Sequence, residues 1–200
     1  LQRERLNVFR GKKSVTASGN IKEIFANIGS VEDAETARAA DAEGVGLFRT
    51  EFLYMDRTKA PDEEEQFEAY CKAAKAFSPD PVVIRTLDVG GDKDIPYLHM
   101  DREENPFMGF RAVRYCLENR ELFKTQLRAL LRAGAEGNIR IMIPMVTCLA
   151  EIRGVKALMA ECCEELKAEG KRFDPELKTG IMVETPAAAA TADILAVEVD

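Results

Sequence analysis

Short apolar runs alternate with longer amphipathic stretches along this chain, and the alternation repeats at similar spacing from about residue 20 to the last residue. This order is typical of parallel strands joined by helices, and it predicts an α/β fold. We expect strands over residues 21–27, 45–49, 82–87, 139–144 and 180–184, with a further strand beginning over 197–200. We expect the helices between them over residues 31–42, 62–77, 106–134, 148–170 and 186–195.

Local signals support these boundaries. Ser30 followed by Asp33 resembles a capping box, and Pro186 suits a first helical turn. Gly134 and Gly137 lie where the long helical region should end. The second, third and fifth strands are almost continuously apolar, as expected when both faces of a parallel sheet are covered. Spacing alone does not separate a barrel from an open doubly wound sheet, because both repeat the same unit.

Composition limits the class of protein. The 200 residues are 46% hydrophobic and 32% charged, which is typical of one globular domain with a sizeable core. The net charge is -7 and basic residues are interspersed with acidic ones, which argues against nucleic-acid binding. No apolar run reaches the roughly 18 residues that cross a membrane. We therefore expect a cytoplasmic protein without membrane insertion, with a linker or entry segment over residues 1–19 and one domain over 20–200.

Three charged residues each follow an apolar strand at its C-terminal end. Arg49 follows VGLF, Arg85 follows VVI and Glu184 follows IMV. In a (β/α)8 barrel the active site is built at that end from the ends of several strands, so these residues favour a barrel. The alternative is that each charge caps its strand and meets solvent or an opposite charge in a loop.

The combination of charges suggests a ligand. A guanidinium group pairs bidentately with phosphate or carboxylate oxygens, so Arg49 and Arg85 predict a small anion that carries such groups. Glu184 would repel this anion unless a Mg²⁺ ion lay between them, since Mg²⁺ binds one or two carboxylates together with substrate oxygens. Arg111 is a third candidate for the anion, although a salt bridge on a helix surface is an equal alternative.

Other polar residues are weaker candidates. The segment LDVGGDKDIP places Asp88 and Asp92 beside two glycines that would let backbone approach a ligand, although an ordinary turn explains them as well. His99 is the only histidine, and it lacks an adjacent general base, so we expect an exposed loop residue rather than a phosphohistidine. The neighbours Cys162 and Cys163 would point to different faces of a helix, and we expect all five cysteines to be reduced thiols.

Several sequence blocks carry a family resemblance. The blocks are GVGLFRTEFLYMDR (44–57), EEEQFEAY (63–70), VVIRTLDVGGDKDIPYL (82–98), EENPFMGFRAVR (103–114), RIMIPMV (140–146) and GIMVETPAAA (180–189). In this order they closely resemble Enzyme I, the phosphoenolpyruvate-protein phosphotransferase family of the bacterial sugar phosphotransferase system. The resemblance implies a (β/α)8 barrel that binds phosphoenolpyruvate and Mg²⁺.

The family's roles transfer to matching positions. The resemblance implies that Arg49 and Arg85 hold the phosphate of phosphoenolpyruvate and that Glu184 is one of two Mg²⁺ carboxylates. It implies transfer of the phosphoryl group to a histidine on a separate N-terminal domain and then to the phosphocarrier HPr. The intact protein is expected to be a homodimer.

The chain resembles only part of such a protein. About five to six of the eight barrel strands can be drawn, and the family's GTNDL-like segment and later cysteine have no counterpart here. We expect a partial barrel that is inactive on its own. A fragment of pyruvate phosphate dikinase or phosphoenolpyruvate synthase is the nearest alternative. A non-catalytic anion-binding module and a metal-dependent lyase barrel acting on a 2-oxo acid are more distant alternatives.

Overall fold

The computed structural model describes residues 7–90, 95–101 and 103–200. Within these residues one sheet of five parallel strands forms, in the order β1-β2-β3-β4-β5. The strands are β1 (Ala26–Ile28), β2 (Val45–Arg49), β3 (Val82–Arg85), β4 (Ile139–Ile143) and β5 (Thr179–Ile181). The predicted α/β class with a parallel sheet is therefore confirmed.

Helices follow the strands. They are α2 (Val31–Ala39), α3 (Glu63–Phe77), α4 (Ala112–Glu118), α5 (Arg120–Gly134), α6 (Leu149–Ala168), α7 (Pro186–Ala190) and α8 (Ala192–Leu195). Short 3-10 helices lie at η1 (Asn7–Phe9), η2 (Thr50–Leu53), η3 (Pro96–Leu98) and η4 (Ala196–Glu198). Among the described residues no helix is both long and apolar enough to cross a membrane.

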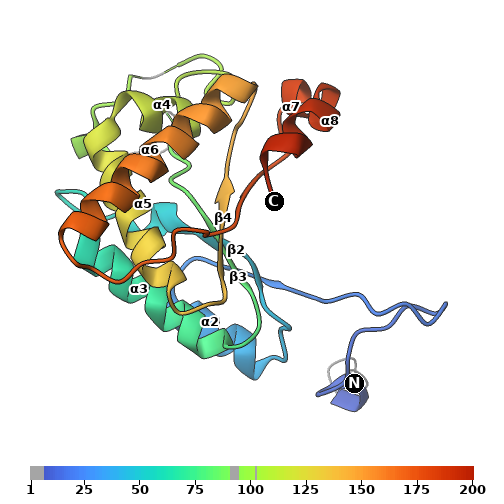
Figure 1. Cartoon of the computed structure of the whole chain (residues 1–200). Coiled ribbons are helices and arrows are strands. Elements are labelled where there is room, and N and C mark those ends of the chain that lie inside the picture. The colour runs from blue at the N-terminus through green and yellow to red at the C-terminus, as the bar shows by residue number, and fades with distance from the viewer. Residues whose placement is uncertain (1–6, 91–94, 102) are drawn as a thin grey trace.

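The strand order separates two architectures that the sequence left open. Each strand pairs with the next one along the chain, and Figure 1 shows helices α2, α3, α5 and α6 on one side of the sheet. A doubly wound sheet reverses its strand order and carries helices on both faces. Consecutive parallel strands with helices on one side are consistent with part of a (β/α)8 barrel, but the sheet of the described residues is not closed and does not confirm one.

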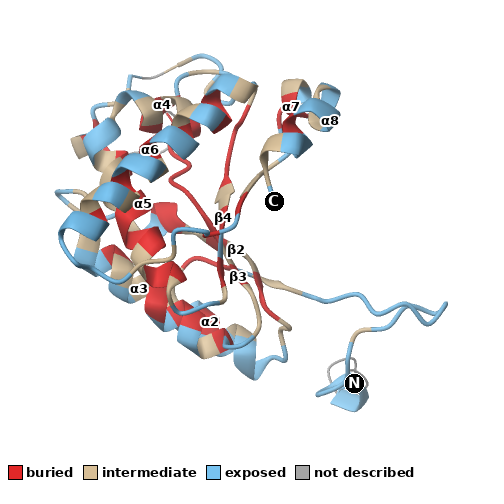
Figure 2. Ribbon diagram, in the orientation of Figure 1, coloured by how far each residue is buried: buried red, intermediate tan, exposed pale blue. Residues whose placement is uncertain are grey.

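The two faces of the sheet differ in burial. In β4 the side chains of Ile139, Ile141 and Ile143 are buried against the helices, whereas Arg140 is exposed and Met142 half-buried. Figure 2 shows the same contrast, with buried segments where helices α3 and α5 meet the strands. Because successive strand residues point to opposite faces, the other face carries the side chains of alternate positions. The prediction that both faces are covered is wrong for the described residues.

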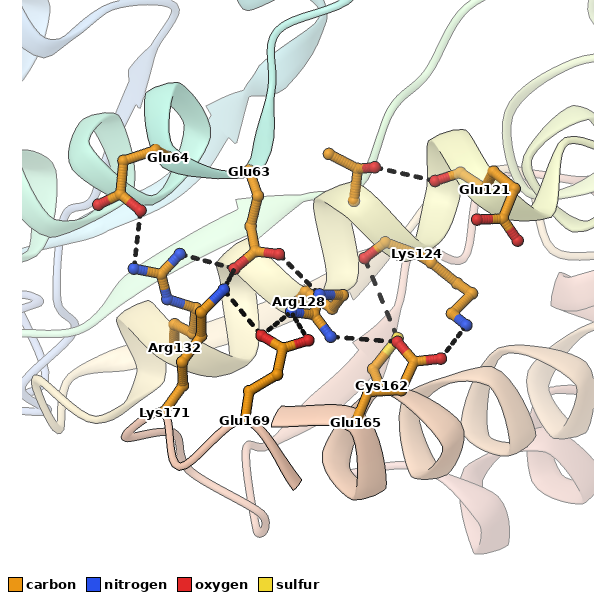
Figure 3. A network of polar contacts seen from close by, with 11 residues as sticks. Glu63, Glu64, Glu121, Lys124, Arg128, Arg132, Cys162, Glu165, Glu169 and Lys171 are labelled. Atoms are coloured by element: carbon orange, nitrogen blue, oxygen red, sulfur yellow. Dashed lines mark hydrogen bonds and ion pairs between the residues drawn. The ribbon is translucent and has the colours of Figure 1, made fainter. Parts of the chain in front are cut away.

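An ionic network joins the helices of the outer layer (Figure 3). Arg128 of α5 donates to Glu63 of α3 at 2.6 Å, to Glu165 of α6 at 3.1 Å and to Glu169, the C-cap of α6, at 2.7 Å. Arg132, one turn further along α5, donates to Glu63 at 2.6 Å. Three helices from separate repeats are thereby held side by side, so the layer behind the sheet is fixed laterally by charge as well as by apolar packing.

Several predicted boundaries need correction. The strand predicted over 21–27 begins only at Ala26, and Ile21 instead forms an isolated antiparallel bridge with Val15. The helical region predicted over 106–134 breaks at Asn119, whose ψ of 60° is not helical. The region predicted over 186–195 breaks at Thr191. Residues 1–6 of the predicted entry segment lie outside the described residues.

The sixth strand is also wrong. Ala196–Glu198 form the 3-10 helix η4, and Val197 is 83% exposed. Only Asp200 reaches the sheet, where its backbone amide donates to the Thr179 carbonyl at 3.2 Å. The Asp200 side chain also accepts from the Thr179 amide at 2.9 Å, but Ala196–Glu198 turn as a 3-10 helix and do not pair along β5.

Candidate functional site

The two strand-end arginines lie side by side. Arg49 and Arg85 are direct partners in the register of β2 and β3, and Arg85 pairs in turn with Met142 of β4. Paired residues of a parallel sheet point to the same face, and both arginines follow a residue buried against the helices, Phe48 or Ile84. Both guanidinium groups therefore belong to the C-terminal edge and to the face that the helices do not cover.

Arg85 is buried in a cluster of opposite charges. Its Nη2 donates to Glu51 Oε1 at 2.7 Å, and its Nη1 lies 3.0 Å from Asp88 Oδ2. Asp88 also accepts from Arg111 Nη2 at 2.8 Å, so one carboxylate joins the two arginines. The side chains of these four residues are at most 9% exposed. Buried ions of this kind are stable only when paired, and the pairing fixes the direction of each guanidinium group.

Arg111 stands at the entrance of helix α4. It follows a loop in which Glu103 accepts twice from the Phe110 amide, at 2.9 and 3.1 Å. Its guanidinium carbon lies 5.1 Å from the centre of the Phe107 ring. Arg111 does form a salt bridge, with Asp88, but the expected place of that bridge on a helix surface is wrong, because Arg111 is 3% exposed.

Arg49 differs from the other two arginines. Within the described part of the chain no carboxylate pairs with it, and its guanidinium carbon lies 4.6 Å from the centre of the Phe52 ring. The Nε atoms of Arg49 and Arg85 are both buried without a hydrogen-bond acceptor among the described residues. Buried donors are almost always satisfied in folded proteins, so two unsatisfied donors on paired positions suit an anionic ligand.

Glu184 lies on the loop between β5 and α7. It is exposed, and its Oε1 accepts from the Met145 amide at 2.8 Å. Met145 has a φ of +58°, a conformation that non-glycine residues seldom adopt. Neither Arg49 nor Arg85 is an ion-pair partner of Glu184 within 7–90, 95–101 and 103–200. The structure thus brings the three arginines to one edge and leaves Glu184 as a separate exposed group beyond β5.

The donor set near Glu184 fits a single-carboxylate contact to a metal ion. One oxygen accepts from the Met145 amide, and the residue as a whole is exposed to solvent. No group of three histidine, cysteine or carboxylate side chains in the described ranges could hold a metal by itself. Mg²⁺ commonly takes only one or two carboxylates and completes its shell with substrate oxygens and water, so the residue present suits it.

Two other candidates behave differently. His99 is exposed at the end of η3, with a φ of +49°, and does not belong to the arginine cluster. Of the glycine-rich segment, Asp88 pairs with Arg85 and Arg111, whereas Gly91 and Asp92 lie outside the described residues.

Sequence reasoning missed the residues that hold the arginines. Glu51 is 4% exposed although it lies in a 3-10 turn after β2, and Gln126 is fully buried in α5. Gln126 had a detectable signal, because it lies three residues after Phe123 and one before Leu127 on the apolar stripe of its helix. A polar residue on such a stripe implies a buried hydrogen-bonding partner.

The open face beside the site is hollow. A depression of about 440 Å³ is lined by side chains of β3, β4 and β5, among them Val83, Met142 and Ile181. Arg85 Nη1 lies 3.9 Å from Met182 Sδ, just beyond the end of β5. The lining of the depression also includes Arg140, Lys178 and Asp200, whereas Arg49, Arg85 and Arg111 are not among the residues that line it.

Comparison with known proteins decides the family. The sequence matches the family described as "PEP-utilising enzyme, PEP-binding domain" over residues 3–200. The chain belongs to this family of PEP-utilising enzymes. Its curated relatives include phosphoenolpyruvate-protein phosphotransferases from Bacillus sp. (strain S), 52% identical over 187 residues, and Staphylococcus carnosus (strain TM300), 50% identical over 198 residues. The resemblance to Enzyme I is confirmed.

The match covers the chain almost completely and the relatives only in part. It takes in 94% and 99% of this chain but 32% and 35% of those two relatives. The chain therefore spans about a third of the length of the curated phosphotransferases it matches. As a member of the PEP-utilising enzymes it carries their PEP-binding domain, with the arginine cluster at the C-terminal edge of its sheet.

Proposed function

We propose that this chain is the phosphoenolpyruvate- and Mg²⁺-binding part of a phosphotransferase that moves the phosphoryl group of phosphoenolpyruvate to a histidine and then to HPr. The observation that carries the proposal is the registered pair Arg49 and Arg85, each with a buried Nε that has no acceptor in the described residues. Residues 20–200 would form the partial (β/α)8 barrel and 1–19 the segment leading into it.

The arginines would bind the phosphate. Arg49 has no carboxylate partner in the described chain and would contribute an uncompensated charge, whereas Arg85 is oriented by Glu51 and Asp88. Arg111, joined through Asp88, would extend the cluster toward the substrate carboxylate or phosphate. Fixed cations that face the phosphoryl group stabilise charge as it moves in the transition state, which is the main source of catalysis in phosphoryl transfer.

Glu184 would hold the metal ion. Its exposed carboxylate, fixed through one oxygen by the Met145 amide, would supply one ligand while substrate oxygens supply others. Bound Mg²⁺ would neutralise negative charge on the substrate oxygens. Glu184 itself would orient the ion from the β5 side of the edge.

The remaining parts of the activity would come from outside this chain. The relatives named phosphotransferases are about three times as long, which leaves room for a phosphoryl-accepting histidine on another domain. That the whole protein is homodimeric and cytoplasmic is part of the proposal and rests on the resemblance to Enzyme I alone. The relatives' names also favour this function over a dikinase or synthase. We expect no transfer of phosphoryl groups from phosphoenolpyruvate to purified HPr by this chain alone, and measurable transfer would contradict that expectation.

Calorimetric titration tests the binding claim. Phosphoenolpyruvate is titrated into the chain with Mg²⁺, and we expect binding by the wild type that is lost in Arg49→Met. Arg49→Met is a cleaner test of binding than a substitution of Arg85, because removal of Arg49 leaves no buried carboxylate unpaired in the described structure. The matched control is Arg120→Met, an exposed arginine of α5 that pairs with Glu161, which should bind as the wild type does.

The variant Glu184→Gln distinguishes the contribution of Mg²⁺ to the affinity from the contribution of the arginines. We expect this variant to lose the dependence of affinity on Mg²⁺ while retaining binding without the metal. A wild-type chain that has a folded circular-dichroism spectrum and binds no phosphoenolpyruvate would contradict the proposal. Equal affinity in the wild type and Arg49→Met would contradict the role of the arginine pair.

A further inference from the structure

Gln126 occupies an unusual position behind the arginine cluster. It lies near the middle of α5, on the face toward the sheet, and is fully buried between the apolar residues Phe123, Leu127 and Leu130. An amide in such a place is tolerated only when its polar atoms are satisfied. The polar atoms of Gln126 bond mainly to backbone and side-chain groups that follow β2 and β3.

Two hydrogen bonds of Gln126 reach residues next to Arg85. Its Oε1 accepts from the Leu87 amide at 2.9 Å, and its Nε2 donates to Thr50 Oγ1 at 3.2 Å. The Thr50 hydroxyl donates in turn to the carbonyl of Arg85 at 2.8 Å. One helical side chain therefore holds the residue after Arg49 and the backbone at and beyond Arg85.

The direction of the amide is determined by its partners. The Leu87 amide is a donor and needs the carbonyl oxygen, whereas the Thr50 hydroxyl has given its proton to Arg85 and accepts. The Tyr70 hydroxyl also accepts from Nε2, at 3.2 Å, and donates to Gln66. Burial raises the pKa of Tyr70, so this hydroxyl stays neutral and available as a donor.

We infer that Gln126 is a positioning residue for the arginine pair. It acts from the helix layer, without contact to a ligand, by fixing the backbone that carries Arg49 and Arg85 on adjacent strands. A second contact to the same segment comes from the Cys116 thiol, 3.8 Å from the Leu87 carbonyl oxygen. The inference rests on the proposed function for its consequence in binding, but its structural part is measurable without any ligand.

The test uses two variants and a matched control. Gln126→Met keeps the length of the side chain and removes all three bonds, and Thr50→Val removes the link to the Arg85 carbonyl from the other side. Tyr70→Phe is the control, because it deletes hydrogen bonds of the same buried network without touching the segment of Arg85. Thr50→Ser retains the hydroxyl and should restore the wild-type result.

The first readout is heteronuclear NMR of the folded chain. We expect Gln126→Met to shift or broaden the Nε signal of Arg85 and to raise hydrogen exchange at the Leu87 amide by about tenfold or more, since the amide loses its acceptor. Thr50→Val should shift the Arg85 signal in the same direction. Tyr70→Phe should lower the unfolding midpoint yet leave the Arg85 signal in place. An unchanged Arg85 signal in Gln126→Met, or in Thr50→Val if the former does not fold, overturns the inference.

The second readout is affinity for phosphoenolpyruvate. Loss of a supporting residue behind a positioned group commonly weakens binding by about tenfold, and we expect that loss in Gln126→Met and Thr50→Val but not in Tyr70→Phe. Equal weakening in Tyr70→Phe would mean a general loss of stability and would overturn the inference. Absence of binding by the wild type would refute the proposed function, while the Arg85 and Leu87 signals would still decide the positioning.

Discussion

Replacing Arg128 should destabilise the chain measurably although it lies far from the candidate site. The Arg128 side chain is 11% exposed and bonds carboxylates on two other helices (Figure 3). The bond to Glu63 is the best shielded, at 2.6 Å with the Glu63 side chain 20% exposed. A hydrogen bond to a charged group contributes about 1.5 to 3 kcal/mol. The Glu165 and Glu169 side chains are 40% and 44% exposed, so water screens these pairs and we assign them no further energy.

The cations that remain in the network reduce the loss of stability in the Arg128 variant. After Arg128→Met, Glu63 still pairs with Arg132 at 2.6 Å, and Glu169 with Lys171 at 2.9 Å. No carboxylate is left without a cation, so the loss in the free energy of unfolding should lie toward the lower end of that range, at about 2 kcal/mol. Urea unfolding followed by circular dichroism measures this difference in the free energy of unfolding.

The control is Arg120→Met on the same helix. Arg120 pairs with Glu161 of α6 at 2.8 Å, but both side chains are about half exposed, at 52% and 49%. Such a surface pair contributes about 0.5 kcal/mol or less. If Arg128→Met and Arg120→Met lose the same small amount of stability, the network does not hold the helix layer together and the reasoning is refuted.

The stability that this network contributes should decrease as the pH falls. Hydrogen bonds from Arg128 and Lys171 lower the pKa of Glu169 to about 2. Burial would raise the pKa of Glu63, but hydrogen bonds from Arg128, Arg132 and Lys171 outweigh it and lower the pKa. An unfolded glutamate titrates near about 4.3, so the unfolded chain takes up protons first as the pH falls. The stability from the network is present above that pKa and is lost as the pH falls toward about 2.

Two further predictions concern single residues. Gly109→Ala should weaken binding of phosphoenolpyruvate severalfold with little change in the unfolding midpoint. The new Cβ would collide with the Glu103 carboxylate that holds the loop before Arg111. Wild-type affinity in a calorimetric titration would contradict a role of this loop in placing Arg111. In the native chain Cys148, which is exposed, should react with Ellman's reagent before Cys162, whose pKa burial raises to about 12. Simultaneous reaction of the two thiols would contradict the packing of α6 against α5.

The neighbouring positions of Arg49 and Arg85 were predictable from the sequence because strand ends obey a simple rule, whereas Glu184 does not join them. Arg49 and Arg85 each end an apolar run, and parallel strands bring such positions to one edge. The pairing of Arg85 with Glu51 and Asp88 was not predictable in this way, because it depends on how two loops fold over the edge. The contact of Glu184 with Met145 depends on a positive φ that no residue pattern signals.

The fold was predictable to the level of element order. Periodicity located four of the strands closely, but it did not show that the helical region before Gly134 breaks at Asn119. It also predicted a strand at Val197, where the chain instead turns as the 3-10 helix η4. Gln126 was missed although it lies on the apolar stripe of its helix, because its partners lie in other elements of the chain.

The central claim is that the C-terminal edge of this sheet binds phosphoenolpyruvate through its arginines. The most direct measurement is heteronuclear NMR of the guanidinium Nε signals while phosphoenolpyruvate and Mg²⁺ are added to the folded chain. We predict that the signals of Arg49, Arg85 and Arg111 move with one common saturation curve, while those of the exposed Arg120 and Arg153 stay in place. Unmoved signals for Arg49 and Arg85, or equal shifts at Arg120 and Arg153, would contradict the account.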